Sequence, residues 1–164
     1  DGKTTFIRNL TGVFRGNGIK SGGVLSERVM NGSHVTGYDL VNIRTGQREV
    51  LLRENGECGP SSIGRYSICL AAVETGNNIL MSLVTGSDAI VVVDEVGLLE
   101  LRGEGWAESL EKLTETSRNH LILAVRNIFL DRVIEKWDLK DPVVFDVTKT
   151  TFNDAFAEIR GSIT

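Results

Sequence analysis

The sequence predicts an α/β fold in which helices flank a mostly parallel central sheet. Residues 89–93 and 121–125 are uninterrupted apolar runs, and residues 143–147 form a third candidate core strand. Apolar runs of this length are typical of parallel strands that are buried on both faces. Helix-compatible segments lie between them, and this alternation favours a parallel sheet covered by helices.

The first helix is predicted over residues 3–14, where apolar side chains recur on one helical face. Gly16-Asn17-Gly18 ends it. Residues 71–83 are also compatible with a helix, although Gly76-Asn77-Asn78 interrupts their pattern. Further helices are expected at residues 106–116 and 129–137, and a last one, capped by Thr150 or Thr151, runs to Ile159.

Between the first helix and the first apolar run, residues 22–54 are rich in β-branched residues and turn signals. Asn31-Gly32 is a hairpin signal, and Thr45-Gly46 is a second turn. We interpret this region as an antiparallel β-meander inserted after the first helix. Residues 56–62 are predicted as a loop, and residues 65–70 as a strand or the approach to a helix.

Bulk composition indicates one domain, covering residues 1–164, with enough apolar content (41%) for a core. The net charge of −4 argues against a general nucleic-acid-binding surface. No apolar run is long enough to span a bilayer. We expect a cytoplasmic protein that is a monomer or a weak oligomer. Cys58 and Cys69 form no close pair in sequence, and we interpret them as two reduced thiols rather than a disulfide or a zinc site.

Gly2-Lys3-Thr4-Thr5 matches the second half of the phosphate-binding pattern G-x-x-x-x-G-K-[ST]. The first glycine of that pattern belongs five residues before Gly2, so we expect it, and the strand that precedes such a loop, in residues upstream of Asp1. A helix that begins here directs its free N–H groups and the positive end of its dipole at a bound anion. In this interpretation Gly2 lets the backbone approach the phosphates and Lys3 reaches the β- and γ-phosphate oxygens.

Asp94 and Glu95 follow the apolar run 89–93 directly. A phosphate-binding loop needs such a partner, because the Mg²⁺ of the bound triphosphate must be held and the attacking water positioned. We expect Thr4 and Asp94 to hold Mg²⁺, and Glu95 to orient or deprotonate the water. Thr5 supports the α-phosphate or simply caps the helix.

The segment Asp94-Glu95-Val96-Gly97-Leu98-Leu99-Glu100-Leu101 resembles the D-E-[IV]-G-x-[ML]-E-L signature of a nucleoside-triphosphatase family. That family includes enzymes of thermophiles and a human cancer-related nucleoside triphosphatase. Residues 63–68, Ile-Gly-Arg-Tyr-Ser-Ile, are similar to its [VI]-G-[KR]-Y-x-[VI] stretch. The hairpin region of that family is similar to three segments of this chain, Ser26-Glu27-Arg28, Gly37-Tyr38 and Thr45-Gly46.

The resemblance covers residues 2–101 and implies a RecA-like or kinase-like P-loop NTPase fold. It also implies hydrolysis of the terminal phosphate of ATP, GTP and other nucleoside triphosphates. Glu100 matches the family pattern. The alternative is that Glu100 is simply an exposed glutamate at a helix start. The chain carries no evident base-recognition motif such as N-K-x-D, which favours loose base selectivity.

Arg126 lies just past the second apolar run, where strands of open α/β sheets meet ligands. It is either a group that stabilises charge on the γ-phosphate or a surface arginine. Arg132 is a weaker candidate for the same role, and Glu27 and Arg28 are candidates for a place near the γ-phosphate or a lid. Structural roles are expected for the remaining conspicuous side chains, His34, His120, Trp106 and Trp137.

Three functions remain open from the sequence. The first is a Mg²⁺-dependent nucleoside-triphosphate phosphohydrolase, which the Asp94-Glu95 pair favours. The second is a kinase that passes the γ-phosphate to a nucleoside, a polynucleotide or a small metabolite. The third is a nucleotide-gated binding module without its own turnover.

Overall fold

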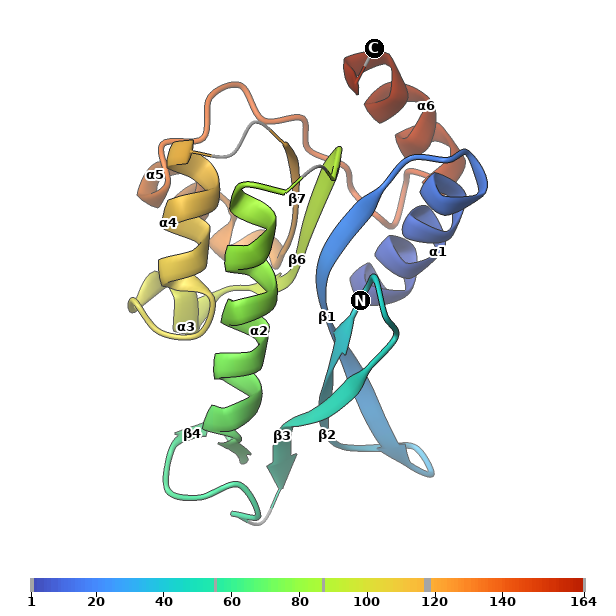
Figure 1. Ribbon diagram of the computed structural model, residues 1–164. Coiled ribbons are helices and arrows are strands. Elements are labelled where there is room, and N and C mark those ends of the chain that lie inside the picture. The colour runs from blue at the N-terminus through green and yellow to red at the C-terminus, as the bar shows by residue number, and fades with distance from the viewer. Residues whose placement is uncertain (1, 55, 87, 117–118, 164) are drawn as a thin grey trace.

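The computed structural model describes residues 2–54, 56–86, 88–116 and 119–163 (Figure 1). Within these residues one seven-stranded sheet has the order β4-β5-β3-β2-β1-β6-β7. Its strands are β1 Ser21–Asn31, β2 His34–Asn42, β3 Arg48–Glu54, β4 Ser62–Ile63, β5 Tyr66–Ile68, β6 Ile90–Val96 and β7 His120–Val125.

The sheet is mixed and mostly antiparallel, so the expectation of a mostly parallel sheet was wrong. Only β1–β6 and β6–β7 pair in parallel, and the other neighbours are antiparallel. The strands β1, β2 and β3 follow one another through short turns, in which Gly32 and Gly46 have left-handed φ angles of 60° and 75°. Strands joined by such short turns must run antiparallel. These strands belong to the main sheet, since β1 pairs with β6 and all three extend it.

The predicted third core strand at residues 143–147 is absent from the described structure. Val143 and Val144 are 61% and 56% exposed. An apolar run becomes a strand only when a neighbouring backbone pairs with it. No described strand pairs with residues 143–147, so their apolar composition alone did not make them a strand.

Helices cover both faces of the sheet (Figure 1). On one side, α1 (Lys3–Gly16) and α6 (Phe152–Ile163) pack together against β1 and its neighbours. On the other side lie α2 (Leu70–Val84) and α4 (Ala107–Thr116). Short helices α3 (Leu98–Leu101), η1 (Asn127–Phe129) and α5 (Leu130–Lys136) follow β6 and β7. The predicted cap of the last helix is confirmed, because Thr151 Oγ1 accepts the N–H of Asp154 at 3.2 Å.

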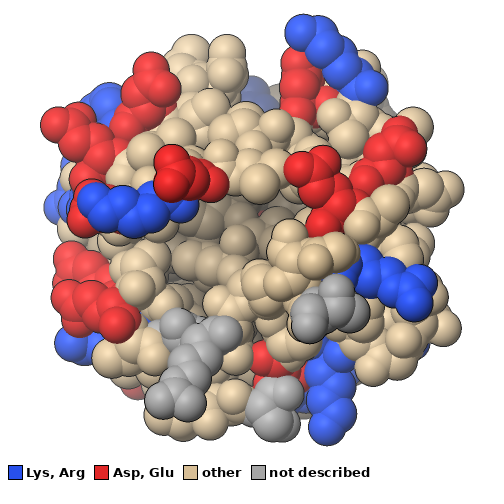
Figure 2. Space-filling model, turned by 90° about the horizontal axis from the view of Figure 1, so that it is seen from above, with Lys and Arg blue, Asp and Glu red and all other residues tan. Residues whose placement is uncertain are grey.

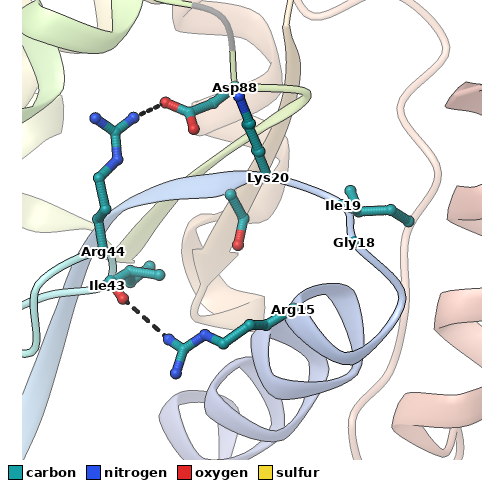
Figure 3. Close-up of a pocket in the computed structure, with 8 residues that line it drawn as sticks. Arg15, Gly18, Ile19, Lys20, Ile43, Arg44 and Asp88 are labelled. Atoms are coloured by element: carbon teal, nitrogen blue, oxygen red, sulfur yellow. Dashed lines mark hydrogen bonds and ion pairs between the residues drawn. The ribbon is translucent and has the colours of Figure 1, made fainter.

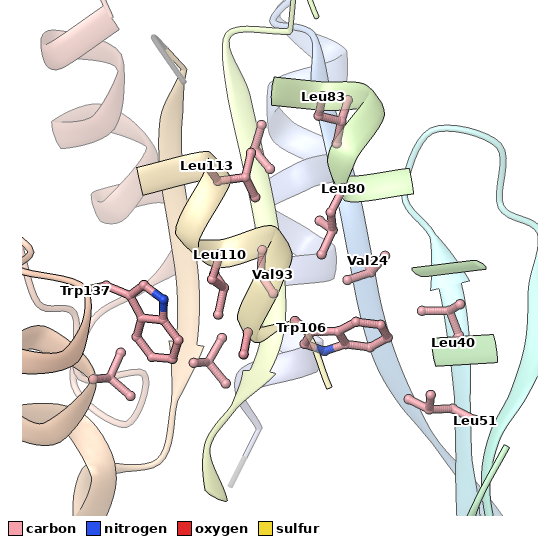
Figure 4. Packing of buried hydrophobic residues seen from close by; sticks show 14 of the residues in the cluster. Val24, Leu40, Leu51, Leu80, Leu83, Val93, Trp106, Leu110, Leu113 and Trp137 are labelled. Carbon is pink, nitrogen blue, oxygen red and sulfur yellow. The ribbon is translucent and has the colours of Figure 1, made fainter. Parts of the chain in front are cut away.

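The larger core cluster fills the space between the sheet and α2 and α4, with Trp106 at its centre (Figure 4). Trp106 and Trp137 are buried, as expected for packing residues. A Cβ at position 76 would overlap the Trp106 ring. Gly76 therefore lets α2 approach this ring, and the helix continues through 76–78 instead of breaking there.

Cys58 and Cys69 form a disulfide, with their Cα atoms 4.6 Å apart, so the reduced-thiol interpretation was wrong. Pairing of β3 with β5 turns the chain back on itself and brings the two cysteines together. Cys69 precedes the first turn of α2, and its N–H donates to the Leu51 carbonyl at 2.9 Å. The bridge thus ties the loop after β3 to the start of α2.

None of the helices in the described part of the chain combines the length and the apolar character needed to cross a bilayer.

Candidate active site

The site begins where α1 begins. Gly2 has a left-handed φ of 97°, a conformation that glycine adopts without the steric cost of a Cβ. Its carbonyl accepts the N–H of Phe6 at 2.9 Å, the first hydrogen bond of the helix. Lys3 and Thr4 therefore lie in the first helical turn, where backbone N–H groups have no partner within the helix. Asp1 lies outside the described residues.

Asp94 is completely buried at the end of β6 and accepts three hydrogen bonds. Its Oδ2 accepts the Thr4 hydroxyl at 2.7 Å and the Ser26 N–H at 3.1 Å, and its Oδ1 accepts the Glu95 N–H at 3.0 Å. Burial raises the pKa of Asp94 to about 6, against the lowering effect of these hydrogen bonds. A carboxylate held here without a cation is therefore costly, and a bound cation relieves that cost.

Glu95 connects two cationic side chains. Its Oε1 is 3.9 Å from Lys3 Nζ, and its Oε2 is 3.5 Å from Arg126 Nε. Its φ is 59°, and the register between β6 and β7 shifts between Val93 and Val96. Such an irregularity re-aims a side chain at a strand end. A left-handed residue other than glycine costs roughly 1–2 kcal/mol, and such costs concentrate at functional sites.

The structure thus brings Lys3, Thr4, Asp94, Glu95 and Arg126 together from α1, β6 and the end of β7, with Gly2 next to them. The meeting point lies at the carboxyl ends of two parallel strands, where ligands bind in open α/β sheets.

Two predicted candidates lie apart from this group of contacts. Thr5 follows Thr4 on α1, is exposed, and makes none of the contacts described above. Arg132 is exposed on α5.

Glu100 is buried, so the alternative of an exposed glutamate was wrong. Its Oε2 accepts the Gly97 N–H at 2.8 Å, and its Oε1 accepts the Trp106 N–H at 3.2 Å. Burial raises the pKa of this carboxyl, and the backbone hydrogen bonds oppose the rise. Glu100 therefore holds the loop after Glu95 against the start of α4. The spacing of Gly97 and Glu100, typical of a capping box, was the available signal for this role.

Glu27 on β1 links α1 to β3. It pairs with Arg8 Nε at 2.9 Å and with Arg48 Nη1 at 2.6 Å, and its side chain is only 12% exposed. Sequence reasoning named Glu27 but missed both arginines, because α1 and β3 are far from it in sequence. Arg28 is exposed on β1. His34 pairs with Glu54 at 2.9 Å on the exposed surface, in line with its expected structural role.

The family model described as NTPase matches residues 1–160. Among similar proteins, Nucleoside-triphosphatase THEP1 of Methanopyrus kandleri is 29% identical over 114 residues, which are 70% of this chain and 62% of the relative. The relative of the same name from Methanothermobacter thermautotrophicus is 27% identical over 143 residues, covering 87% and 80% of the two chains. Human cancer-related nucleoside-triphosphatase is 26% identical, covering 96% of this chain and 88% of its own length.

Two solved structures share the fold. The solution structure of a human cancer-related nucleoside triphosphatase superposes with a TM-score of 0.73 at 26% identity, covering 100% of this chain and 92% of the other. The crystal structure of THEP1 from Aquifex aeolicus superposes with a TM-score of 0.72 at 15% identity, covering 99% and 92%. Because the NTPase family model matches residues 1–160, nearly the whole length, the chain belongs to the NTPase family.

Proposed function

We propose that this chain hydrolyses nucleoside triphosphates, ATP and GTP among them, to diphosphate and phosphate in the presence of Mg²⁺, on a P-loop NTPase fold. The observation that carries the proposal is the hydrogen bond from Thr4 to Asp94, 2.7 Å long, which joins the G-K-T-T helix start to the acidic end of β6. Relatives named as nucleoside-triphosphatases support hydrolysis as the reaction.

The residues present fit a magnesium ion. Asp94 and Thr4 offer a carboxylate and a hydroxyl oxygen, and Mg²⁺ is commonly held by one or two protein oxygens together with phosphate and water. When bound, Mg²⁺ neutralises phosphate charge. The Ser26 and Glu95 N–H groups fix the Asp94 carboxylate in place.

Lys3 and Arg126 supply the positive charge of the site. Both contact Glu95 through different carboxylate oxygens, so their ammonium and guanidinium groups flank the same position. In the reaction they stabilise the negative charge of the γ-phosphoryl group during transfer. The helix start after Gly2 binds the remaining phosphate oxygens through backbone N–H groups.

Glu95 acts on the attacking water. Its carboxylate accepts a proton from the water as the water oxygen forms a bond to the γ-phosphorus, and the bond from that phosphorus to the β–γ bridging oxygen breaks. The nucleoside diphosphate leaves with the electron pair of that bond. Because a triphosphate attracts Lys3, its binding releases Glu95 from the Lys3 contact for this task.

The variant Glu95→Gln tests the assignment. It keeps the shape of the side chain but removes the base, so turnover is expected to fall by about 100-fold or more while nucleotide binding persists. Phosphate release from ATP and GTP measures turnover, and calorimetric titration with Mg·ADP measures binding. The exposed Glu49→Gln variant is the matched control. Unchanged turnover in Glu95→Gln would exclude this role.

The kinase alternative is not favoured, since the relatives carry the names of triphosphatases. The phosphate-release assay distinguishes it, because a kinase needs an acceptor and forms a phosphoester in place of free phosphate. A nucleotide-gated module would bind ATP tightly without appreciable release.

We also propose that the protein works in the cytoplasm as a monomer or weak oligomer. The bridge between Cys58 and Cys69 argues against this location, because disulfides are rare in the cytoplasm outside hyperthermophiles. Trapping thiols with an alkylating reagent in intact cells, followed by mass spectrometry of Cys58 and Cys69, measures the pair in its native compartment.

A further inference from the structure

A second concave site lies at the opposite end of the molecule from Asp94. A pocket of about 470 Å³ is lined by residues from the end of α1, the start of β1, the turn after β2 and the segment before β6. These include Arg15, Lys20, Ile43, Arg44 and Asp88 (Figure 3). Figure 2 views the molecule from above Figure 1, and Lys and Arg side chains lie among Asp and Glu side chains on that face. Ligand sites commonly have volumes of about 300–1,000 Å³.

The pocket carries an excess of positive charge. Arg44 forms an ion pair with Asp88, whose side chain is only 5% exposed, so these two charges compensate each other. Arg15 Nη2 donates to a neutral group across the pocket, the Ile43 carbonyl, at 3.4 Å, and Arg15 has no ion pair within the described part of the chain. Lys20 forms no ion pair with any residue in the described ranges. Two uncompensated cations therefore line the pocket of a chain whose net charge is −4.

The helix dipole opposes an anion here, because α1 ends at the pocket. That end is equivalent to roughly half a negative charge. Two full positive charges outweigh it. The Arg15 guanidinium also offers a planar pair of N–H donors, which suits phosphate and carboxylate groups.

The pocket is separate from the proposed active site. Lys3 and Arg15 lie near opposite ends of α1, a helix of 14 residues that is roughly 20 Å long at 1.5 Å per residue. β1 and β6 likewise begin at the pocket, with Ser21 beside Ile90, and run toward Asp94. A small ligand in one site therefore does not reach the other.

We propose that this pocket binds a small multivalent anion that carries phosphate or carboxylate groups, held by Arg15 and Lys20 with Arg44 at the wall. The pair of compensated charges, Arg44 and Asp88, shapes the site, while Arg15 and Lys20 provide its affinity. The site is independent of triphosphate hydrolysis.

Calorimetric titration tests the proposal with two probes, inorganic pyrophosphate and citrate. The protein is the full chain with Lys3→Ala, in a buffer with a chelator, so that phosphate binding at the helix start is weakened. We expect one-to-one binding of at least one probe, and the tighter probe identifies the group that the pocket prefers. Adding Lys20→Ala or Arg15→Ala to this background is expected to weaken binding about tenfold or more, since hydrogen bonds to charged groups contribute about 1.5–3 kcal/mol.

Lys140→Ala in the same background is the control, because Lys140 is an exposed lysine that does not line the pocket. The proposal is overturned if neither probe binds, or if Lys20→Ala and Arg15→Ala bind as tightly as the control. With Lys3 intact, Lys20→Ala is expected to hydrolyse ATP at the wild-type rate. A wild-type protein without hydrolysis but with Lys20-dependent pyrophosphate binding would overturn the proposed function and leave the pocket standing.

Discussion

Replacing Asp94 by asparagine should stabilise the nucleotide-free protein while impairing the site. The pKa of Asp94 is about 6 in the folded protein and 3.8 in the reference state. Because the folded-state value is raised, the folded protein binds the proton more tightly than the unfolded chain does. The stability from this group is fully present below pH 3.8 and is lost as pH rises through about 6.

The difference of roughly two pH units corresponds to about 3 kcal/mol of folding free energy lost at neutral pH. An uncharged asparagine recovers that amount. The NH₂ group of the asparagine amide then faces one of the three groups that donate hydrogen bonds to Asp94. Loss of that hydrogen bond costs about 1–2 kcal/mol. The net expectation at pH 7.5 is a gain of about 1–2 kcal/mol, or roughly 5 °C in Tm for a domain of this size.

Thermal unfolding in the presence of a chelator measures this gain, and the same scan with Mg·ADP measures ligand stabilisation. We expect Asp94→Asn to raise Tm at pH 7.5 without nucleotide, and to show less stabilisation by Mg·ADP than the wild type. At pH 4.5 the advantage should shrink, because Asp94 is then protonated in the folded protein. The exposed Asp141→Asn variant is the control. A loss of more than about 1 kcal/mol at pH 7.5 would refute the reasoning.

Two further predictions concern Glu100 and the disulfide. Glu100→Ala leaves the buried N–H groups of Gly97 and Trp106 without acceptors and should destabilise the protein by about 2–4 kcal/mol in chemical denaturation. The control is Glu104→Ala at an exposed position, which should change stability by less than about 0.5 kcal/mol. Equal effects of the two substitutions would contradict the role of Glu100. Reduction of the bridge between Cys58 and Cys69 should cost about 2–3 kcal/mol from loop entropy, seen as a lower Tm with reductant. Two reactive thiols in the unreduced, denatured protein would contradict the disulfide.

Local patterns predicted the elements that make the site. The helical face of α1 and the apolar run of β6 are visible within short windows, because their side chains pack on a single sheet. The meeting of Thr4 with Asp94 was also expected, since a G-K-T-T helix start needs an acidic partner to handle a metal-bound triphosphate.

Pairings between distant segments were not predictable in the same way. Whether residues 143–147 become a strand depends on a neighbouring backbone, not on their own composition. The Cys58–Cys69 bridge depends on the alignment of β3 with β5. Burial of Glu100 depends on the Trp106 N–H, which reaches its carboxylate only after the chain has turned through Gly105, with φ of 58°.

The end of β6 departs from two rules of stable folding, and both departures lie at the residues whose function the sequence predicted best. An ionised carboxylate is buried at Asp94, and Glu95 adopts a left-handed backbone. Each feature costs folding free energy, and neither is needed to complete the sheet. Proteins retain such costs where activity requires them. The proposed binding of a cation and a phosphate accounts for two acids near the end of a buried strand, where stability does not, and the Thr4 and Lys3 contacts support that proposal.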